Sequence, residues 1–590
     1  MRKAPALILA LAMAFTLAVP AFASGEASGE TVEDTGPKAA IVIGDEGEIA
    51  DDEQTENFDL TYFPGGAKTD TGVGGFAFTS PASETAFLFS ELKEDGGAYY
   101  TVGGDGANVA LDEYPVTEAA AQWLSDVGVA AFDSAIVLGD EALAAACPPV
   151  ISAKGYTYLN IDGTLVLADG AARSAVYADV SGGSTVPGPG AGGAQGSETP
   201  IVIVRRSLLE TTGGTQTESA SEEVFSVLST GIRARGIQPQ GKSITYLYDS
   251  AIVSRTWGAW STDSARGDLD LVAWRSLGYS QGGYGAYADT SCHLYLYGST
   301  VMGSSDGVVA SNNGEIYAVP SNSAETSATL RTAMGKNANR ELSWTDFADG
   351  ASGEPMDSAI IGGQAAVQFH MPDMGHSGAK NGQKATLYMA GGKLATDIGL
   401  LGGNGIQSLN SISAYNQRYA GACIVTKSTQ VNALLKGVEM DSWSGELIHT
   451  MINSDSNVND IADGDEAPGS DITFQDMHVT GDIVNDDYQR SLRLTLVNTT
   501  LTGAIRSNTC ADWNELCETQ FDGQYILNPD GYDSVWGVAV YLTDGAVWNV
   551  TETSVIQDIE IFDGCVVNGI ITPNADGTLT VSPLTSGEAS

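Results

Sequence analysis

The sequence predicts an all-β chain folded as a parallel β-helix, a solenoid of short strands that advances one rung per repeat. Three consecutive units of 25, 24 and 23 residues support this prediction: Ser243–Gly267, Asp268–Ser291 and Cys292–Gly314. Each unit begins with alternating apolar residues, the pattern of a strand with one buried face. Because a unit of this length cannot bury its own apolar face, successive units are expected to stack.

The alignment of these units predicts which residues share a column along the coil. We align Gly258, Gly285 and Gly307, each of which lies in the second short strand of its unit. The opening strands are expected to bury equivalent sets of alternating residues: Ile244, Tyr246 and Tyr248; Leu269 and Leu271; Leu294 and Leu296.

Two later repeats support the solenoid independently. Ile472–Ile483 aligns with Leu494–Ile505 at an offset of 22 residues, and Val540–Asn549 aligns with Ile559–Asn568 at an offset of 19. Both offsets are close to one rung. The β-helix is therefore predicted to occupy residues 200–572, followed by a C-terminal tail at residues 573–590.

Composition agrees with this fold and excludes several classes of partner. The 71 glycines and few lysines are typical of an all-β chain with many tight turns. The chain has 27 basic and 74 acidic residues and a net charge of −47. Such a chain repels nucleic acid and anionic membranes, and it favours cations such as calcium. The acidity can also serve only to keep a repeat protein soluble.

The N-terminus has the pattern of an export signal. Arg2 and Lys3 precede the apolar run Ala6–Val19, and the small-x-small site at Ala21–Ala23 predicts cleavage after residue 23. Cleavage removes those two bases, so the mature chain has 25 basic and 74 acidic residues, a net charge of −49. Residues 24–60 are predicted to be a flexible acidic leader. The expected location is secreted or at the cell surface.

Residues 61–180 are predicted to form a β-rich N-terminal region that caps the solenoid. Its strand candidates are Ala86–Phe89, Ala98–Val102, Ala135–Leu138, Tyr156–Ile161 and Thr164–Leu167. Thr117–Val127 is its helical segment, with Thr117 as N-cap; it is expected either to cover the open first rung or to be a loop excursion. Residues 181–199, rich in Gly, Pro and Ser, are predicted to be a linker or projecting loop. Pro320–Asn339 is expected to be a loop.

The later repeats also resemble a known family. The segments ITFQDMHVTGDI, LTLVNTTLTGAI and GAVWNVTETSVIQDIEIFDGCVVNG are similar to rungs of large right-handed parallel β-helix proteins exported by gut-type anaerobic bacteria, which are often described as adhesin-like. This resemblance covers roughly residues 155–569. It implies a right-handed coil and an extracellular location, and it identifies no ligand.

An exposed aromatic strip is the first candidate binding site. The alignment places Trp260, Tyr287 and Val309 in a column expected to face the core. It places Trp257, Tyr284 and Asp306 in a column expected to face solvent, with Trp274 nearby. Flat aromatic surface beside polar groups is suited to sugar rings, so Trp257, Trp274, Tyr284 and Asp306 are the predicted ligand-binding residues. The alternative is that these aromatics pack within the rungs.

A calcium site is the second candidate. Asp455, Asn457, Asn459, Asp463 and Glu466 place oxygen atoms at positions 1, 3, 5, 9 and 12 of a loop, the ligand spacing of an EF-hand. The loop departs from that pattern at position 6, where Asp460 replaces glycine. Calcium is therefore the predicted cofactor, and an accidental match in an acidic chain is the alternative.

Two further features carry little chemistry by sequence alone. His370, Asp373 and His376 are metal-binding residue types on a predicted loop, with exposed histidines as the alternative. Cys510 and Cys517 are close enough in sequence to pair, whereas the other cysteines are expected to be single core residues.

The function expected from these features is a non-catalytic, adhesin-like β-helix that binds an extracellular glycan or a host or matrix protein. A polysaccharide lyase or glycoside hydrolase of the same fold is one alternative. Hydrolases of this fold use clustered aspartates on adjacent rungs, and no such motif set is present. A structural envelope or matrix protein is the other alternative.

Overall fold

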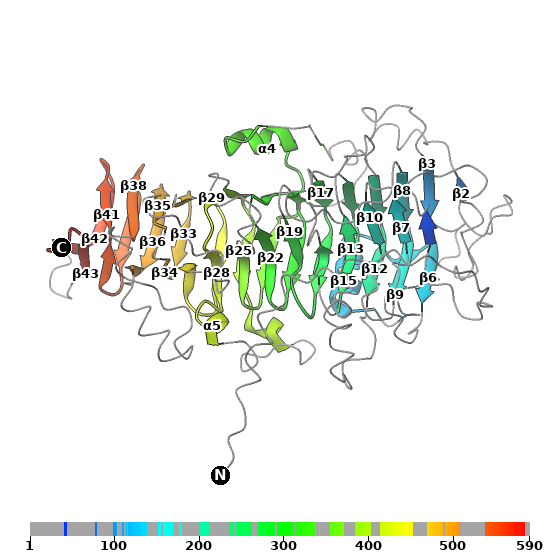
Figure 1. Cartoon of the computed structure of the whole chain (residues 1–590), viewed down its shortest axis with the longest axis horizontal. Coiled ribbons are helices and arrows are strands. Elements are labelled where there is room, and N and C mark those ends of the chain that lie inside the picture. Colours follow the sequence, from blue (N-terminus) through cyan, green and yellow to red (C-terminus); the bar gives the residue numbers. More distant parts are fainter. Residues whose placement is uncertain are drawn as a thin grey trace, which may run out of the picture.

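The chain forms long parallel sheets of stacked strands, wound as a solenoid (Figure 1). A computed structural model describes residues 41–43, 77–78, 98–102, 109–110, 112, 114, 116–138, 151–154, 157–168, 176–179, 201–211, 235–239, 243–255, 258–261, 269–289, 292–311, 313–337, 342, 354–370, 384–402, 414–451, 469–487, 490–507 and 537–584. Each complete rung contributes one strand to each of three sheets in turn, so strands that are neighbours in a sheet come from successive rungs.

Sheet 1 is the longest, and its strands pair in parallel except for the antiparallel pair β2–β3. In spatial order its strands are β2 (Ala77–Phe78), β3 (Ala98–Val102), β8 (Thr157–Asp162), β11 (Ile201–Arg205), β14 (Ile244–Tyr248), β17 (Leu269–Trp274), β20 (Cys292–Tyr297), β23 (Glu315–Val319), β26 (Ala385–Ala390), β29 (Val431–Lys436), β32 (Ser470–Gln475), β35 (Leu492–Val497), β38 (Val538–Thr543) and β41 (Asp558–Ile561).

Sheet 2 follows sheet 1 in each rung. Its strands are β6 (Ser134–Leu138), β9 (Thr164–Ala168), β12 (Leu208–Thr211), β15 (Ala251–Ser254), β18 (Leu277–Ser280), β21 (Thr300–Gly303), β24 (Ala359–Gly362), β27 (Lys393–Thr396) and β30 (Glu439–Asp441). A separate parallel set serves the same place in the last rungs: β33 (His478–Thr480), β36 (Thr500–Gly503), β39 (Val547–Val550) and β42 (Val566–Pro573).

Sheet 3 completes each rung. Its strands are β1 (Ile41–Ile43), β7 (Ile151–Lys154), β10 (Val176–Asp179), β13 (Arg235–Pro239), β16 (Gly258–Ser261), β19 (Ala286–Ala288), β22 (Asp306–Ser311), β25 (Ala365–His370), β28 (Ala422–Lys427), β31 (Glu446–Met451), β34 (Asp482–Asp486), β37 (Ile505–Ser507), β40 (Ser554–Ile556) and β43 (Leu579–Pro583). Outside the three sheets, β4 (Val109–Ala110) pairs with β5 (Ala131–Phe132), and a 3₁₀ turn spans Ile398–Gly402.

The two late repeats have the predicted register. Ile472 pairs with Leu494, Thr480 with Thr502 and Ile483 with Ile505. Val540 pairs with Ile559, and Asn549 pairs with Asn568. In β32, β35 and β38 buried residues alternate with more exposed ones, so the period-two pattern identifies the inward face without ambiguity.

The first predicted unit is out of register by one residue. Gly285 and Gly307 do align, since Ala286 pairs with Val308, but Trp260 pairs with Ala286 and not with Tyr287. In sheet 1, Ile244 pairs with Asp270, so Leu247 faces the core in line with Ala273 and Leu296. The alternation failed in β14 because this strand is buried on both faces, and apolar residues therefore occur on both.

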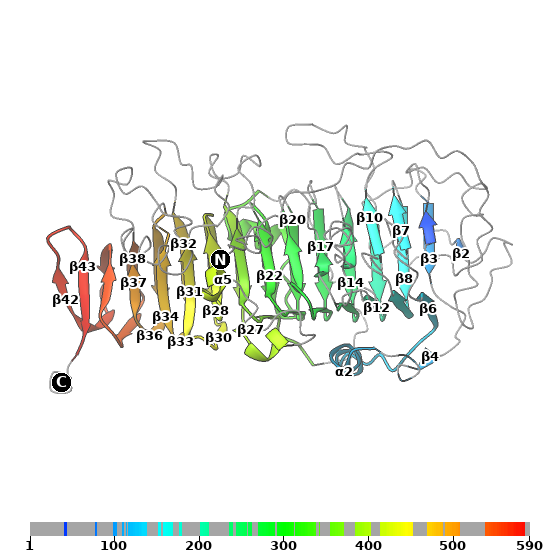
Figure 2. The ribbon, with the colours of Figure 1, turned by 60° about the horizontal axis from the view of Figure 1, so that its bottom comes forward.

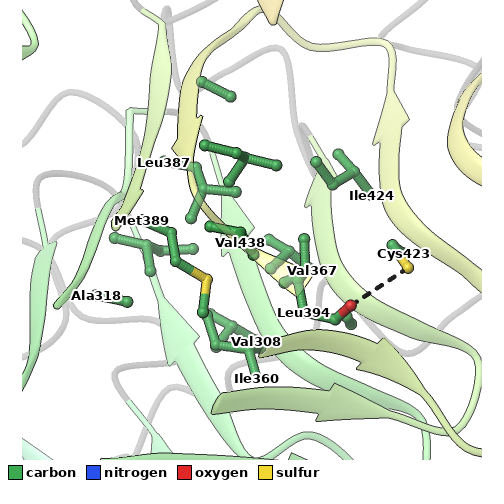
Figure 3. Close-up of a cluster of buried hydrophobic side chains, with 14 of the residues drawn as sticks. Val308, Ala318, Ile360, Val367, Leu387, Met389, Leu394, Cys423, Ile424 and Val438 are labelled. Carbon is green, nitrogen blue, oxygen red and sulfur yellow. Dashed lines mark hydrogen bonds between the residues drawn. The ribbon is translucent and has the colours of Figure 1, made fainter. Parts of the chain in front are cut away.

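The core is one continuous column of apolar side chains inside the coil. Figure 3 shows Met389 of β26, Ile360 of β24 and Val308 of β22 pointing toward one another and toward Val438, which lies between β29 and β30; all four are buried. Trp260 and Trp548 are fully buried. Trp260 has room because Gly278 lies beside it: a Cβ at position 278 would be 2.7 Å from Cε2 of the indole.

The corner between sheets 1 and 2 is built from a repeated two-residue device. Its first residue has a left-handed backbone, as at Arg206, Asp249, Arg275, Gly298 and Asn498, with φ between 44° and 57°. The second residue is a buried Ser or Thr. Its hydroxyl donates to the carbonyl two residues earlier, as Ser250 Oγ does to Tyr248. It also accepts the backbone N–H of the equivalent residue in the preceding rung, as in Ser207 N–H to Ser250 Oγ at 3.2 Å. The same bonds recur through Ser276 and Ser299.

Helix α2 (Glu118–Asp126) begins after Thr117 as predicted, but it does not cover the end of the coil. Its buried residues Ala120 and Leu124 belong to a cluster on the outer side of sheet 2, with Ala251 and Leu277. Figure 2 shows α2 lying alongside the coil. The helix therefore protects a flank of the N-terminal rungs.

The segment Pro320–Asn339, predicted to be a loop, contains helix α4 (Ser327–Ala333). Thr326 and Thr329 form a capping box at its start, and Leu330 packs on the outer face of sheet 1. Polar residues made the segment loop-like by composition, whereas those polar residues cap the helix and anchor it to the sheet.

The predicted C-terminal tail contains strand β43. This strand pairs antiparallel with β40 and with β42, and Val581 is fully buried. The predicted signal peptide, the linker at residues 181–199 and the strand candidate Ala86–Phe89 lie outside the described residues. So does the leader, apart from Ile41–Ile43, which pairs in parallel with β7.

Candidate functional site

The predicted aromatic strip is not exposed. Trp274, Tyr284 and Asp306 are 4%, 6% and 7% exposed, and Trp257 lies outside the described residues. Trp274 is on the outer face of sheet 1, where it stacks on Tyr248 and donates from Nε1 to the carbonyl of Ser321 at 2.8 Å. The segment that leads into α4 thus covers the indole, so the expectation of a solvent-facing Trp274 was wrong.

Tyr284 and Asp306 lie instead at a polar and aromatic surface on the outer face of sheet 3. We call this surface the sheet 3 strip. It consists of two residues that contact the strands from outside the sheet, Arg418 and Tyr419, and of six strand residues: Tyr287, Gln368, His370, Lys427, His449 and Asp486. Two outward columns build it. One column contains Tyr287, Val309, Gln368, Val425 and His449, and the other contains Ser311, His370, Lys427, Met451 and Asp486.

Tyrosines dominate the N-terminal half of the strip. Tyr287 and Tyr284 meet edge to face with ring centroids 5.1 Å apart, and Val309 completes this cluster. The hydroxyl of Tyr287 lies 2.9 Å from Nε2 of His370, and the hydroxyl of Tyr284 lies 2.9 Å from Oγ of Ser261. Two tyrosine rings from one rung, each with a hydrogen-bonding hydroxyl, therefore gather at this end of the strip.

A buried lysine lies in the middle of the strip. Lys427 Nζ donates to the hydroxyl of Tyr419 at 2.8 Å and lies 4.1 Å from the centre of its ring. That hydroxyl donates to Oε1 of Gln368 at 3.1 Å. Burial raises the pKa of Asp306 to about 6, although the charge of Lys427 opposes this rise. Tyr419 follows helix α5 (Ala414–Gln417), which lies at the edge of the coil beside β28 (Figure 1).

A charged cluster forms the C-terminal half of the strip. His449 is fully buried, with Nδ1 2.7 Å from Oε2 of Glu446 and Nε2 3.0 Å from Oδ2 of Asp486. Arg418 Nε donates to the same Asp486 oxygen at 3.0 Å. Burial alone would lower the pKa of His449, but the charges of and hydrogen bonds to the two carboxylates outweigh it and raise the pKa to about 9. His449 is thus an imidazolium at neutral pH that donates to both carboxylates.

A second buried network attaches α4 to sheet 1. Arg331 of α4 donates to Nε2 of His293 at 2.7 Å, so Nδ1 of His293 carries the hydrogen and donates to Asp270 at 2.8 Å. Glu315 accepts from Tyr317 at 2.7 Å and lies 3.2 Å from Lys336 Nζ. These charges compensate one another within the contact between α4 and the sheet, so we assign the network to anchoring the helix.

Most of the predicted metal ligands lie outside the part of the chain that the structure describes. The calcium loop, Asp455 to Glu466, lies outside the described residues, as do Asp373, His376, Cys510 and Cys517. Calcium binding stays a prediction. Within the described ranges, no three His, Cys, Asp or Glu side chains are arranged to hold a metal ion. Cys292 and Cys423 are buried in the core, as expected.

Comparison with known proteins adds no family. The chain matches no protein-family model, and comparison with curated proteins and with solved structures gives no significant match. In the part of the chain that is described, no helix has the length and apolarity needed to cross a bilayer.

Sequence reasoning missed His449, Lys427 and Arg418 as members of one surface. Asp486 is the last residue of β34 and Asp487 follows it, and both side chains are buried. The sequence does place charged residues at equivalent positions of successive rungs, and this spacing could have indicated the surface. Equivalent positions can be identified, however, only when the register of sheet 3 is known.

Proposed function

We propose that this protein is a right-handed parallel β-helix, exported to the outside of a bacterial cell, that binds extracellular glycans through the sheet 3 strip without catalysing a reaction. The predicted export signal and the resemblance to adhesin-like proteins support the location. The concentration of tyrosine, histidine, lysine, arginine and glutamine on one outer face supports the binding role, and this observation carries the proposal.

The chemistry of the strip suits a hydroxyl-rich ligand. Sugar rings stack on aromatic faces, and their hydroxyls both donate and accept hydrogen bonds. Tyr287 itself is buried, but polar groups at and beside the strip reach the surface. His370 is partly exposed, Arg418 has 35% of its side chain exposed, and the neighbouring Glu446 has 22% of its side chain exposed.

The candidate acids and bases of the strip already have partners. Both ring nitrogens of His449 are hydrogen-bonded to carboxylates, and Lys427 is bonded to Tyr419. A general base must reach a substrate proton, so this bonding favours positioning over proton transfer. For this reason we place binding ahead of the lyase or hydrolase alternative.

A glycan array with the purified mature protein, with and without calcium, tests the proposal. His370→Ala and Arg418→Ala should each weaken binding by about tenfold, the loss of roughly one good polar contact. His478→Ala and Arg493→Ala, which change exposed residues on other faces, are the matched controls.

Equal binding by all four variants would remove the strip from the binding site. Binding to a host or matrix protein in place of any glycan would favour the protein-ligand alternative. Release of reducing sugar or unsaturated product from pectin, alginate or mucin glycans would establish an enzyme.

A further inference from the structure

The C-terminal end of the coil is closed on two sides and open on the third. Strand β43 turns back antiparallel across β40 and β42 and so covers the ends of sheet 3 and of the β42 sheet. Strand β41 is the last strand of sheet 1; it pairs with β38 and has no partner on its other edge among the described strands.

The apolar interior is exposed at this open side. Ile559 and Ile561 continue the inward columns of Val540 and Leu542, which are fully buried. Ile561 is nevertheless 42% exposed, and the next residue, Phe562, is 47% exposed. Five of the six exposed large hydrophobic residues in the described chain belong to the last turns of the coil: Val555, Ile561, Phe562, Val566 and Ile570. One more strand on β41 would cover Ile559 and Ile561 as each earlier rung covers its neighbour.

The outward residues of β41 are acidic and exposed. They are Asp558 and Glu560, which alternate with the two isoleucines. Two rungs earlier in the Asp558 column, an acid and a base pair across neighbouring strands: Arg493 of β35 lies 2.7 Å from Asp471 of β32. A base beside an acid on the next strand is thus how this face of sheet 1 balances its charge.

We propose that the free edge of β41 is a docking site for an extended cationic segment of another protein, which adds to sheet 1 as one further strand. Its apolar side chains would cover Ile559 and Ile561, and its alternating Lys or Arg side chains would face Asp558 and Glu560. Backbone hydrogen bonds along a sheet edge supply affinity in such strand addition, and alternate side chains supply specificity. A second copy of this chain fits poorly, because two β41 strands would bring like charges together and each chain carries a net charge of −47.

The fluorescein-labelled heptapeptide KVKVKVK is the test probe, with fluorescence anisotropy measured at about 0.15 M salt, where long-range charge effects are screened. The peptide should bind, and hydrogen exchange should show new protection in β41. EVEVEVE and the scrambled KKVVVKK should bind about tenfold more weakly or less. Two further peptides carry N-methyl groups, one at every valine and the other at every lysine. In a strand, alternate residues point their N–H groups to opposite edges, so only one of these peptides loses the N–H groups that face β41. That peptide alone should lose binding.

The double variant D558K/E560K should lose affinity for KVKVKVK by about tenfold and gain affinity for EVEVEVE. The variant E118K/D126K makes the same change in net charge on exposed positions of α2 and should leave both affinities unchanged. The proposal is overturned if the two double variants have the same affinities, or if the scrambled peptide binds as well as KVKVKVK. It is also overturned if light scattering shows that the chain is a dimer and hydrogen exchange shows that β41 is protected in that dimer.

Discussion

Single hydroxyl groups hold the corner between sheets 1 and 2. Ser250 accepts the backbone N–H of buried Ser207 and donates to the carbonyl of Tyr248 at 2.7 Å. Ser250→Ala should therefore lower the free energy of unfolding by about 1–3 kcal/mol, the cost of leaving a buried donor unsatisfied.

Urea unfolding followed by circular dichroism measures this effect. Ser250→Thr should stay near wild type, because Thr499 makes the equivalent pair of bonds in a later rung. Ser125→Ala, on the exposed side of α2, is the control. Equal stability of Ser250→Ala and Ser125→Ala would show that the corner hydroxyls do not contribute.

His449 links charge to stability at a single position. Its pKa is raised to about 9, so its stabilising contribution is complete below the unfolded value of about 6.5 and is lost as the pH rises through about 9. His449→Gln removes the cation from Glu446 and Asp486 and should cost about 3 kcal/mol at pH 7.

Melting temperatures of the wild type and His449→Gln at several pH values between about 6 and 10 test this linkage. The gap between the two proteins should narrow as the pH passes about 9. His478→Gln, an exposed histidine on β33, should change little. A gap that does not depend on pH would mean that His449 is not charged in the folded protein.

Paired elements fit one another by size in the core. Trp260 of β16 occupies the space left by Gly278 of β18. Gly278→Ala should destabilise the protein by about 1–3 kcal/mol, because the indole cannot move out of a packed interior.

A double-mutant cycle with Trp260→Leu measures the coupling between the two positions. The two substitutions together should cost less than the sum of the single costs, by about 0.5–3 kcal/mol. Additive costs would mean that the two side chains do not compete for the same space.

The sequence predicts the register and the inward face of a strand reliably only when one of the two faces of that strand is buried. The pairing of Ile472–Ile483 with Leu494–Ile505 was predicted residue for residue, because these strands bury only one face. In β14 the alternation gave the wrong phase, because α4 and neighbouring aromatics cover the outer face of sheet 1 as well. The expected exposure of Trp274 and Tyr284 was wrong for the same reason: both aromatic side chains are buried on outer faces of the sheets.

At the scale of the whole molecule, the coil determines which residues meet. Tyr287 and His370 are 83 residues apart and share a contact, as do Arg418 and Asp486 at 68 residues. No local pattern contains this information, because the rungs differ in length and the insertions between strands are irregular. The register between successive rungs brings these distant residues together in the sheet 3 strip.

The stacking of rungs can be measured directly in solution. Asn432, Asp471, Arg493, Ala539 and Asp558 lie in one outward column across five consecutive strands of sheet 1. Four strand spacings of about 4.8 Å place the Cα atoms of Asn432 and Asp558 about 19 Å apart.

Dipolar electron spin resonance between labels at positions 432 and 558, attached through unnatural amino acids so that the native cysteines stay free, gives this distance. We predict a single narrow distribution near 19 Å, and a shorter one near 14 Å for labels at 471 and 558. Broad distributions, or a distance that does not shorten by about one strand spacing when the label moves from 432 to 471, would contradict the stacked coil.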